Sequence, residues 1–359
     1  MKSSKIISIT SVRNEADIIE SFVRYTLNIV DRMVINENCS SDNTLDILKK
    51  LQLEGLNIDI IKDKNQTFSQ SATLNELTDY TMKKYNPDWI LPLDADEFIY
   101  HNRHINPRKN LSKLNPLQVN LFQWVTYVIT GQEENIPFVP QKIKYRRKNE
   151  IEKYYKCILS RELFEKGGRL LIGAHNIAFS EMHNYREELN KSIFIAHYPV
   201  RSKTQLEQKI ITGVLNKRAL YPIGMDIGHH QVSVFNRIKK EGKLRDTTLK
   251  QISKYYAISN RKEKIELLLD PINCRFCNNI DIKYDESIRD NILGLALETA
   301  ESIIVKQRNQ IKDSELALNT VEELKSELTR ISDLLDKTIN SKGWKMLERY
   351  RGFIRYFKK

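Results

Sequence analysis

The sequence lacks long apolar runs, and no stretch of it approaches the ~20 consecutive apolar residues that a membrane-spanning helix needs. It also lacks the apolar core and small-residue cleavage site of a secretion signal, because residues 1–10 pass directly into a strand-like run that starts at Ile6. These absences argue against a membrane-spanning protein, and we expect a cytoplasmic one.

Cysteine is scarce as well. The 4 cysteines are too few and too scattered for the disulfide framework of a secreted protein. Cys274 and Cys277 form a single CxxC pair, which is half of a possible zinc site, but no second Cys or His pair lies at zinc-finger spacing. We therefore do not expect a structural zinc ion.

Acidic residues are fewer than basic ones, which leaves a net charge of +12. Half of it lies in residues 340–359, where seven basic residues and one acid give +6. Aromatic and aliphatic side chains recur there at helical spacing: Trp344, Leu347, Tyr350, Phe353, Ile354 and Phe357. This composition fits either an interfacial helix on an anionic membrane or a terminal helix packed on its own domain.

Strand and helix patterns alternate through the first hundred residues, as in a parallel sheet with crossover helices. Strands are expected at residues 6–10, 32–36, 57–62 and 89–93, and helices at 16–30, 41–54 and 69–85. Residues 111–197 are strand-rich and should complete the sheet, whereas the chain is helical from 203 onward. We expect an α/β fold with four segments: 1–213, 214–286, 287–339 and 340–359.

The third of these segments should be one long helix, because it has no proline and only one glycine, near its start. Five apolar residues alternate three and four positions apart, which is coiled-coil spacing: Val321, Leu324, Leu328, Ile331 and Leu335. Two interpretations remain open, a homo-oligomer formed through this helix and a helix that packs back on the domain.

Polar clusters follow three of the expected strands, at residues 11–15, 37–42 and 94–97. Ligands of open parallel sheets bind beyond the carboxyl ends of the strands, so these clusters are site candidates. The third closes the run LPLDADEF, residues 91–98, with Asp94, Asp96 and Glu97. Carboxylates this close repel unless a cation holds them, and oxygen ligands suit Mg²⁺ or Mn²⁺. The alternative is an acidic helix N-terminus.

Four motifs in order make the chain resemble family 2-type glycosyltransferases with the GT-A fold, and in particular a bacterial branch with an RNEADII opening and a DADEF acidic motif. Residues 13–17 match the opening, residues 38–44 resemble the segment dnSSDgT, and residues 196–202 with Lys209 and Gly213 resemble the HYpvRS block. Gln70 and Asn75 fall where the family has a glutamine and an asparagine.

The resemblance covers roughly residues 6–213 and implies a Rossmann-like mixed sheet with flanking helices, followed here by the helical extension. It implies that a nucleotide-sugar donor, UDP- or GDP-linked, binds Arg13, Asn14, Glu15, Glu37, Asn38, Asp42, Gln70, Asn75 and Asp94. Asp94, Asp96 and His197 would hold Mn²⁺ or Mg²⁺, while Arg201 and Lys209 would contact acceptor or phosphate. The family often has an acid at the position of Asn38, so base selectivity does not carry over.

The implied reaction is an inverting hexosyl transfer to an acceptor hydroxyl, in glycan or polysaccharide synthesis. The acceptor would be a glycan or a lipid-linked molecule, and the basic tail would then dock the enzyme peripherally on the membrane. The usual Glu-Asp pair is not recognisable, which leaves His175 and Glu181 as candidate bases; each could instead have a structural role in a loop.

Three other functions remain to be weighed. A nucleotidyltransferase also uses a nucleotide and a metal, and is the nearest enzymatic alternative. A basic nucleic-acid-binding protein fits the charge but not the acidic motif, so no nucleic acid is expected. A coiled-coil adaptor with an inactive transferase domain is the third, although the acidic motif is intact.

Overall fold

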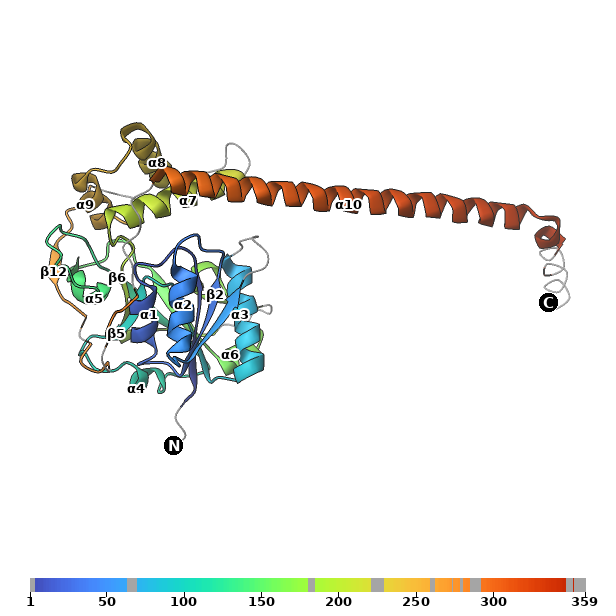
Figure 1. Cartoon of the computed structure of the whole chain (residues 1–359). Coiled ribbons are helices and arrows are strands. Elements are labelled where there is room, and N and C mark those ends of the chain that lie inside the picture. The colour runs from blue at the N-terminus through green and yellow to red at the C-terminus, as the bar shows by residue number, and fades with distance from the viewer. Residues whose placement is uncertain are drawn as a thin grey trace. The chain divides into compact units, whose positions relative to one another are not determined.

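A computed structural model gives the structure of the chain and describes residues 4–62, 70–179, 185–220, 229–258, 262–272, 274–277, 280–284, 292–346 and 351. It divides into two compact units, Met1–Glu298 and Thr299–Lys359 (Figure 1). Every strand of the described residues belongs to the first unit.

The first unit is built on an eight-stranded mixed sheet with the strand order β3-β2-β1-β4-β8-β6-β11-β5. Its first four strands in that order pair in parallel, and β6 is also parallel to β11, whereas β8 and β5 run antiparallel to their neighbours. The strands are β1 (Ile6–Val12), β2 (Arg32–Glu37), β3 (Ile58–Lys62), β4 (Trp89–Pro92), β5 (Glu97–His101), β6 (Val119–Thr126), β8 (Tyr155–Ser160) and β11 (Glu187–His197).

Two small sheets complete the strand content. They pair β7 (Tyr145–Arg147) with β12 (Leu267–Leu269) and β9 (Arg169–Leu170) with β10 (Ile177–Ala178). The β7–β12 ribbon contributes to the wall of a pocket, because the lining residues Arg146, Arg147 and Asp270 lie in it or directly after it.

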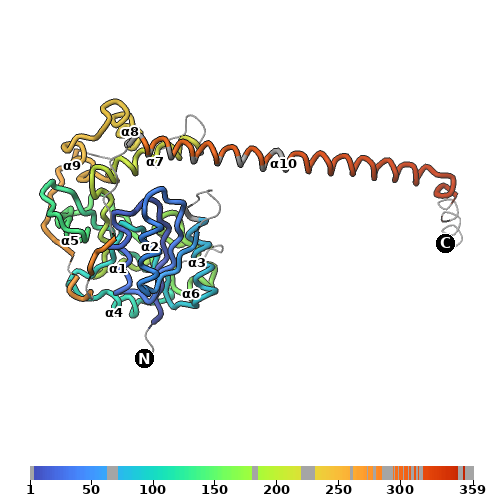
Figure 2. The backbone as a smooth tube through the Cα atoms, viewed as in Figure 1, coloured from blue at the N-terminus to red at the C-terminus, as the bar shows by residue number. Residues whose placement is uncertain are grey.

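Helices cover both faces of the large sheet. The alternation along β1 shows this, because Ile6 packs in the core cluster formed with α1 (Ile19–Thr26) and α2 (Thr44–Leu53), whereas Ile7 and Ile9 pack with α3 (Gln70–Tyr85). The remaining helices of this unit are α4 (Arg108–Leu111), α5 (Val139–Lys142), α6 (Arg161–Glu165), the 3₁₀ turn η1 (Ile172–Ala174), α7 (Lys203–Leu220), α8 (His229–Glu241) and α9 (Asp246–Lys254). Figure 2 shows α7 and α8 next to each other, in agreement with their contacts.

The predicted fold class is confirmed: a mixed sheet with flanking helices, followed by C-terminal helices. The element boundaries differ most at the first helix, which begins at Ile19 rather than at Ala16. Asn14 adopts a positive φ of 57°, and the backbone N–H groups of Glu15 and Ala16 donate to side chains of the next loop instead of entering the helix. Residues 14–18 are therefore a loop at the carboxyl end of β1.

The long C-terminal helix α10 (Ile292–Asn340) confirms the predicted helical segment. Its regularly spaced apolar side chains are exposed: Leu324 is 62%, Leu328 69% and Leu335 58% accessible to solvent. The coiled-coil interpretation stays a prediction, because pairing needs a partner. Within the described residues, no helix is long and apolar enough to cross a membrane.

Candidate active site

The loops after β1 and β2 form one hydrogen-bonded unit. Asn14 Oδ1 accepts a hydrogen bond from the backbone N–H of Ser41 at 2.8 Å, and the backbone N–H of Asn14 donates to Ser40 Oγ at 3.1 Å. Ser40 is held in turn, since its N–H donates to Glu37 Oε1 at 2.6 Å. Three residues predicted for the nucleotide pocket, Asn14, Glu15 and Glu37, thus lie in two loops that fix each other.

Asp42 is the second link between these loops. Its carboxylate accepts hydrogen bonds from the N–H of Ala16 at 3.1 Å and from both the N–H and the hydroxyl of Thr44, at 3.0 and 2.5 Å. Burial raises the pKa of Asp42, and these hydrogen bonds oppose that rise. Asn38 continues the pairing of the strands through its N–H to Val12 O, at 2.9 Å. Arg13 Nε is buried without a hydrogen-bond partner among the described residues.

The acidic motif contains the local turn that the sequence requires if both aspartates are to reach one site. β4 ends at Pro92, Ala95 and Asp96 form a turn, and the N–H of Glu97 donates to Asp94 O at 3.0 Å as β5 begins. Asp94 is partly exposed, whereas Asp96 and Glu97 are buried. The three carboxylates therefore occupy different environments.

Lys156 of β8 neutralises two of these carboxylates. Its ammonium group lies 2.9 Å from Asp94 Oδ2 and 2.7 Å from Glu97 Oε2, and its side chain is 1% exposed. Burial opposes the charge of Lys156, but the two carboxylates hold its pKa above the ordinary value. Burial also raises the pKa of Glu97 to about 8. Lys156 is not among the predicted site residues, although a lysine inside an otherwise apolar strand is a detectable signal.

Asp96 is surrounded by basic side chains. Its Oδ2 lies 3.1 Å from Lys209 Nζ, 3.7 Å from His197 Nε2 and 3.8 Å from Arg201 Nη1. Burial alone would raise the pKa of Asp96, but Lys209 and His197 lower it well below its usual range. The HYpvRS block, the following helix and the acidic motif, far apart in sequence, therefore meet at this carboxylate.

Arg201 joins this group to the first loop. Its guanidinium, 3% exposed, lies 2.5 Å from Glu15 Oε2 and 2.7 Å from Asp17 Oδ2. Burial raises the pKa of Glu15 to about 7, although Arg201 lowers it and Asp96 raises it further. Arg201 was expected to contact acceptor or phosphate, whereas the structure engages it with carboxylates of the opening motif.

Aromatic rings form one wall beside Asp96. The Trp124 ring lies 4.2 Å from the ring of His197 and 5.3 Å from that of His175, centroid to centroid, and the Tyr256 ring is 5.5 Å from His197. Trp124 and Tyr256 were not among the predicted site residues. The rings bring the candidate base His175 into the same wall as the candidate metal ligand His197.

The orientation of His175 is fixed by the backbone. Its Nδ1 lies 2.7 Å from Tyr155 O, which can only accept, so Nδ1 carries the proton and Nε2 is the basic nitrogen of the neutral ring. Gly173, with φ of 69°, makes room for the ring, since a Cβ there would lie 2.6 Å from Nε2. Burial lowers the pKa of His175, which keeps the ring neutral near pH 7.

Three other predicted residues are not part of this cluster: one has its partners elsewhere, and the side chains of the other two are not among the described ones. Asn75 exchanges two hydrogen bonds with the backbone of Leu170, each 2.9 Å, and so ties α3 to β9. Gln70 begins α3, but its side chain is outside the described ones, and Glu181 lies outside the described residues altogether.

No group of three or more His, Cys, Asp or Glu side chains in the described part of the chain is arranged to hold a metal ion. Asp96 and His197 nevertheless fit as a pair of ligands, because they face each other at 3.7 Å and His197 Nδ1 is buried without a partner among the described residues. Five carboxylates also lie against three permanent cations in this network: Glu15, Asp17, Asp94, Asp96 and Glu97 against Lys156, Arg201 and Lys209.

The comparison with protein families gives a match at the position of this site. Residues 8–166 match the model of the family described as Glycosyl transferase family 2. The matched segment contains the loops after β1 and β2, the acidic turn and Lys156. No curated protein matches the sequence of the chain.

Solved structures with a related chain path are distant. S. aureus TarS 1-349 is 13% identical, with a TM-score of 0.34 and 64% of this chain and 69% of that chain covered. The mannosyltransferase PcManGT from Pyrobaculum calidifontis, in complex with GDP-Man and Mn²⁺, is 13% identical, with a TM-score of 0.36 and coverages of 63% and 67%. A putative glucose-1-phosphate thymidylyltransferase from Bacillus anthracis is 9% identical, with a TM-score of 0.29 and coverages of 52% and 87%. Similarities this distant assign no chemistry to this chain.

Proposed function

We propose that this chain is a glycosyltransferase that moves a sugar from a nucleotide-sugar donor to an acceptor hydroxyl. One observation carries the proposal: Arg201 joins the loop after β1 to the acidic turn, and that loop is hydrogen-bonded to the loop after β2, so that all three, inside the segment that matches glycosyl transferase family 2, meet at one edge of the sheet. Strand ends of this kind are where open α/β sheets bind nucleotides.

We assign each group of residues a role from its position in the site. The loops that carry Asn14, Glu15, Glu37 and Asp42 bind the nucleoside. Lys209, 3.1 Å from Asp96, supplies positive charge to the diphosphate. Arg201 positions Glu15 and Asp96 relative to each other.

His175 is the candidate base, because its Nε2 is unprotonated and its ring contacts the same tryptophan as His197. Attack by the activated acceptor hydroxyl on the face opposite the leaving diphosphate gives inversion at the anomeric carbon, as the family resemblance implies. The product anomer, determined by NMR, tests this assignment: retention of configuration would refute it.

A divalent cation, Mn²⁺ or Mg²⁺, belongs to the proposal. Asp96 and His197 would hold it, with Asp94 released from Lys156 as the third ligand. Its chemistry would be to neutralise the charge that develops on the leaving nucleoside diphosphate. The approach of His197 Nε2 to Asp96 Oδ2, at 3.7 Å, supports this part of the proposal.

Ligand-dependent unfolding tests the site. With Mn²⁺ and UDP or GDP at about 100 times Kd, the wild-type chain should gain about 2.7 kcal/mol of unfolding free energy. Asp96→Asn should abolish that gain, whereas Asp46→Asn, whose side chain is 67% exposed on α2, should retain it. Equal stabilisation of the two variants by Mn²⁺ and nucleotide would refute the assignment of Asp96 to the binding site. Release of nucleoside diphosphate, rather than pyrophosphate, from a nucleotide sugar separates this function from nucleotidyl transfer.

Two further parts of the proposal concern partners. The acceptor is a glycan or a lipid-linked molecule, and the basic aromatic residues 340–359 would dock the enzyme on an anionic membrane; deleting them should abolish vesicle binding and leave donor hydrolysis intact. The exposed apolar residues of α10 support a homo-oligomer, which sedimentation of Leu328→Glu against the wild type tests.

A further inference from the structure

A pocket lies on strands that also build the candidate active site. It has a volume of about 580 Å³, within the size range of small-molecule sites, and its walls come from β5, β6, β11 and the β7–β12 ribbon. Neighbouring residues of β6 contribute to the pocket and to the candidate active site. Gln123 and Val125 line the pocket, whereas Trp124 between them contacts His197. Because side chains alternate along a strand, the pocket and the Trp124 wall lie on opposite faces of β6.

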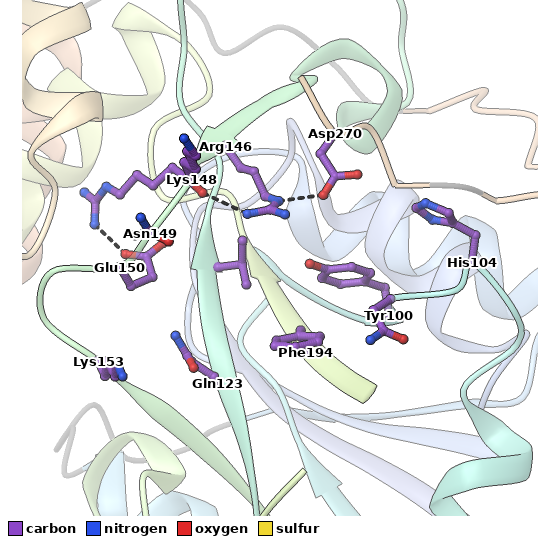
Figure 3. A pocket seen from close by; sticks show the side chains of 13 residues that line it. Tyr100, His104, Gln123, Arg146, Lys148, Asn149, Glu150, Lys153, Phe194 and Asp270 are labelled. Carbon is purple, nitrogen blue, oxygen red and sulfur yellow. Dashed lines mark hydrogen bonds and ion pairs between the residues drawn. The ribbon is translucent and has the colours of Figure 1, made fainter. Parts of the chain in front are cut away.

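The floor of the pocket is aromatic. Tyr100 of β5 and Phe194 of β11 lie on paired residues of adjacent strands, with ring centroids 5.9 Å apart and planes tilted by 33°. Figure 3 shows both rings beside Gln123, with the Arg146 side chain extending toward Tyr100 and Asp270. Aromatic rings that line a hollow offer apolar surface against which the C–H groups of a sugar ring pack.

Polar groups without partners stand around that floor. The Gln123 amide, the Tyr100 hydroxyl and the Asn149 amide have no hydrogen-bond partner among the described residues. Burial raises the pKa of Tyr100 to about 12, so its hydroxyl keeps its proton and can donate. Amides and a phenol both donate and accept hydrogen bonds, as the recognition of sugar hydroxyl groups requires.

The charge of the lining selects among sugars. Four cationic side chains, those of Arg146, Arg147, Lys148 and Lys153, face two anionic ones, those of Asp270 and Glu150. Arg146 and Arg147 are paired with the two acids at 2.6 and 2.9 Å, and Lys148 is paired with Glu266 at 2.9 Å. Lys153 makes no ion pair within the part of the chain that is described, so it is available to a ligand anion.

We propose that this pocket binds a saccharide that carries negative charge, and that it holds the acceptor glycan at a place separate from the donor site. The assignment of this saccharide as the acceptor rests on the proposed glycosyltransferase function. The binding of the saccharide to the pocket does not depend on that function. The aromatic floor, the unpartnered amides and the unpaired charge of Lys153 together match the C–H faces, hydroxyl groups and acid groups of such a chain.

Calorimetric titration of the full chain tests the proposal with three probes: tetragalacturonate, neutral maltotetraose and tetraglutamate. Tetragalacturonate should bind at least about tenfold more tightly than either of the others, because it alone presents both ring faces and charge. Gln123→Leu and Lys153→Ala should each weaken its binding by about tenfold, the effect of one lost polar contact. The exposed Lys113→Ala, outside the pocket, should leave binding unchanged.

Several outcomes would contradict the proposal that this pocket binds an anionic saccharide. Equal binding of tetragalacturonate by the wild type and both pocket variants would place the glycan elsewhere, and equal binding of tetraglutamate would reduce the effect to charge. Donor hydrolysis, measured in the same variants, keeps the two proposals apart. If hydrolysis is absent while glycan binding follows the pocket, the proposed function fails and the binding site stands; the reverse result removes the site alone.

Discussion

The two faces of β6 differ in how their polar groups are satisfied. On the Trp124 face, the charged side chains of the candidate active site are paired with one another, as the buried Lys156 is with Asp94 and Glu97. On the Gln123 face, two arginine–carboxylate pairs lie beside polar groups, among them the Gln123 amide, that have no partner among the described residues. A paired, buried network fixes its own geometry, whereas unpartnered groups await a ligand, so equal substitutions should have unequal effects on stability.

The largest effect is expected at Arg201. Arg201→Leu would leave Glu15 and Asp17, which now accept hydrogen bonds at 2.5 to 2.8 Å, without a counter-charge in a buried site. Breaking such a pair should lower the free energy of unfolding by about 3–5 kcal/mol, measured by urea denaturation. The matched control is Arg186→Leu, whose side chain is 76% exposed and 3.5 Å from Glu188. It should change stability by less than ~1 kcal/mol, and equal losses in the two variants would contradict the comparison.

Lys156→Met comes next. The fully buried Glu97 would lose its counter-charge. Burial raises the pKa of Glu97 to about 8 and Lys156 lowers it, so without Lys156 the carboxyl should be protonated at neutral pH, which limits the loss to roughly 3 kcal/mol. Adding Glu97→Gln should recover part of that stability, because a neutral amide then replaces the buried carboxyl. Additive losses in the double variant would show that the two side chains do not interact.

The sequence predicts the regular half of this molecule well, for a physical reason. The parallel strands β1 to β4 are apolar runs closed by polar clusters, so periodicity places them within a few residues, and the carboxyl-end rule brings Glu15, Glu37 and Asp96 to one edge.

What the sequence does not contain is the partner of each charge. The partners of Lys156 and Arg201 are determined by contacts between segments that are far apart in the chain. Arg201, for example, contacts Glu15, which is 186 residues away in sequence. The first helix was placed three residues early because the N–H groups of Glu15 and Ala16 bond to the next loop, a tertiary contact that no local propensity reveals. The sequence does not predict the pocket for the same reason, since three strands and a ribbon build it.

A smaller effect is expected from pH. Burial lowers the pKa of His175 below its ordinary value near 6.5, so below about pH 6.5 the unfolded chain binds this proton more readily than the folded chain does. The folded state should therefore lose stability relative to His175→Gln as the pH falls from 7 to 5, in paired urea titrations. Glu15 and Glu97 titrate in both proteins and cancel in the difference. Parallel curves for the two proteins would show that this ring is not held neutral by the fold.

The smallest effect is expected at Gln123, and its neighbour on the same strand makes the comparison sharpest. Gln123→Leu removes an amide that has no described partner and keeps the side-chain volume, so stability should change by no more than ~0.5 kcal/mol and donor hydrolysis should persist. Trp124→Leu removes the ring that stacks 4.2 Å from His197, so donor hydrolysis should fall sharply. Because the two residues are adjacent, a change in strand pairing would affect both alike. Equal losses of hydrolysis in the two variants would therefore mean that the faces of β6 are not separate sites.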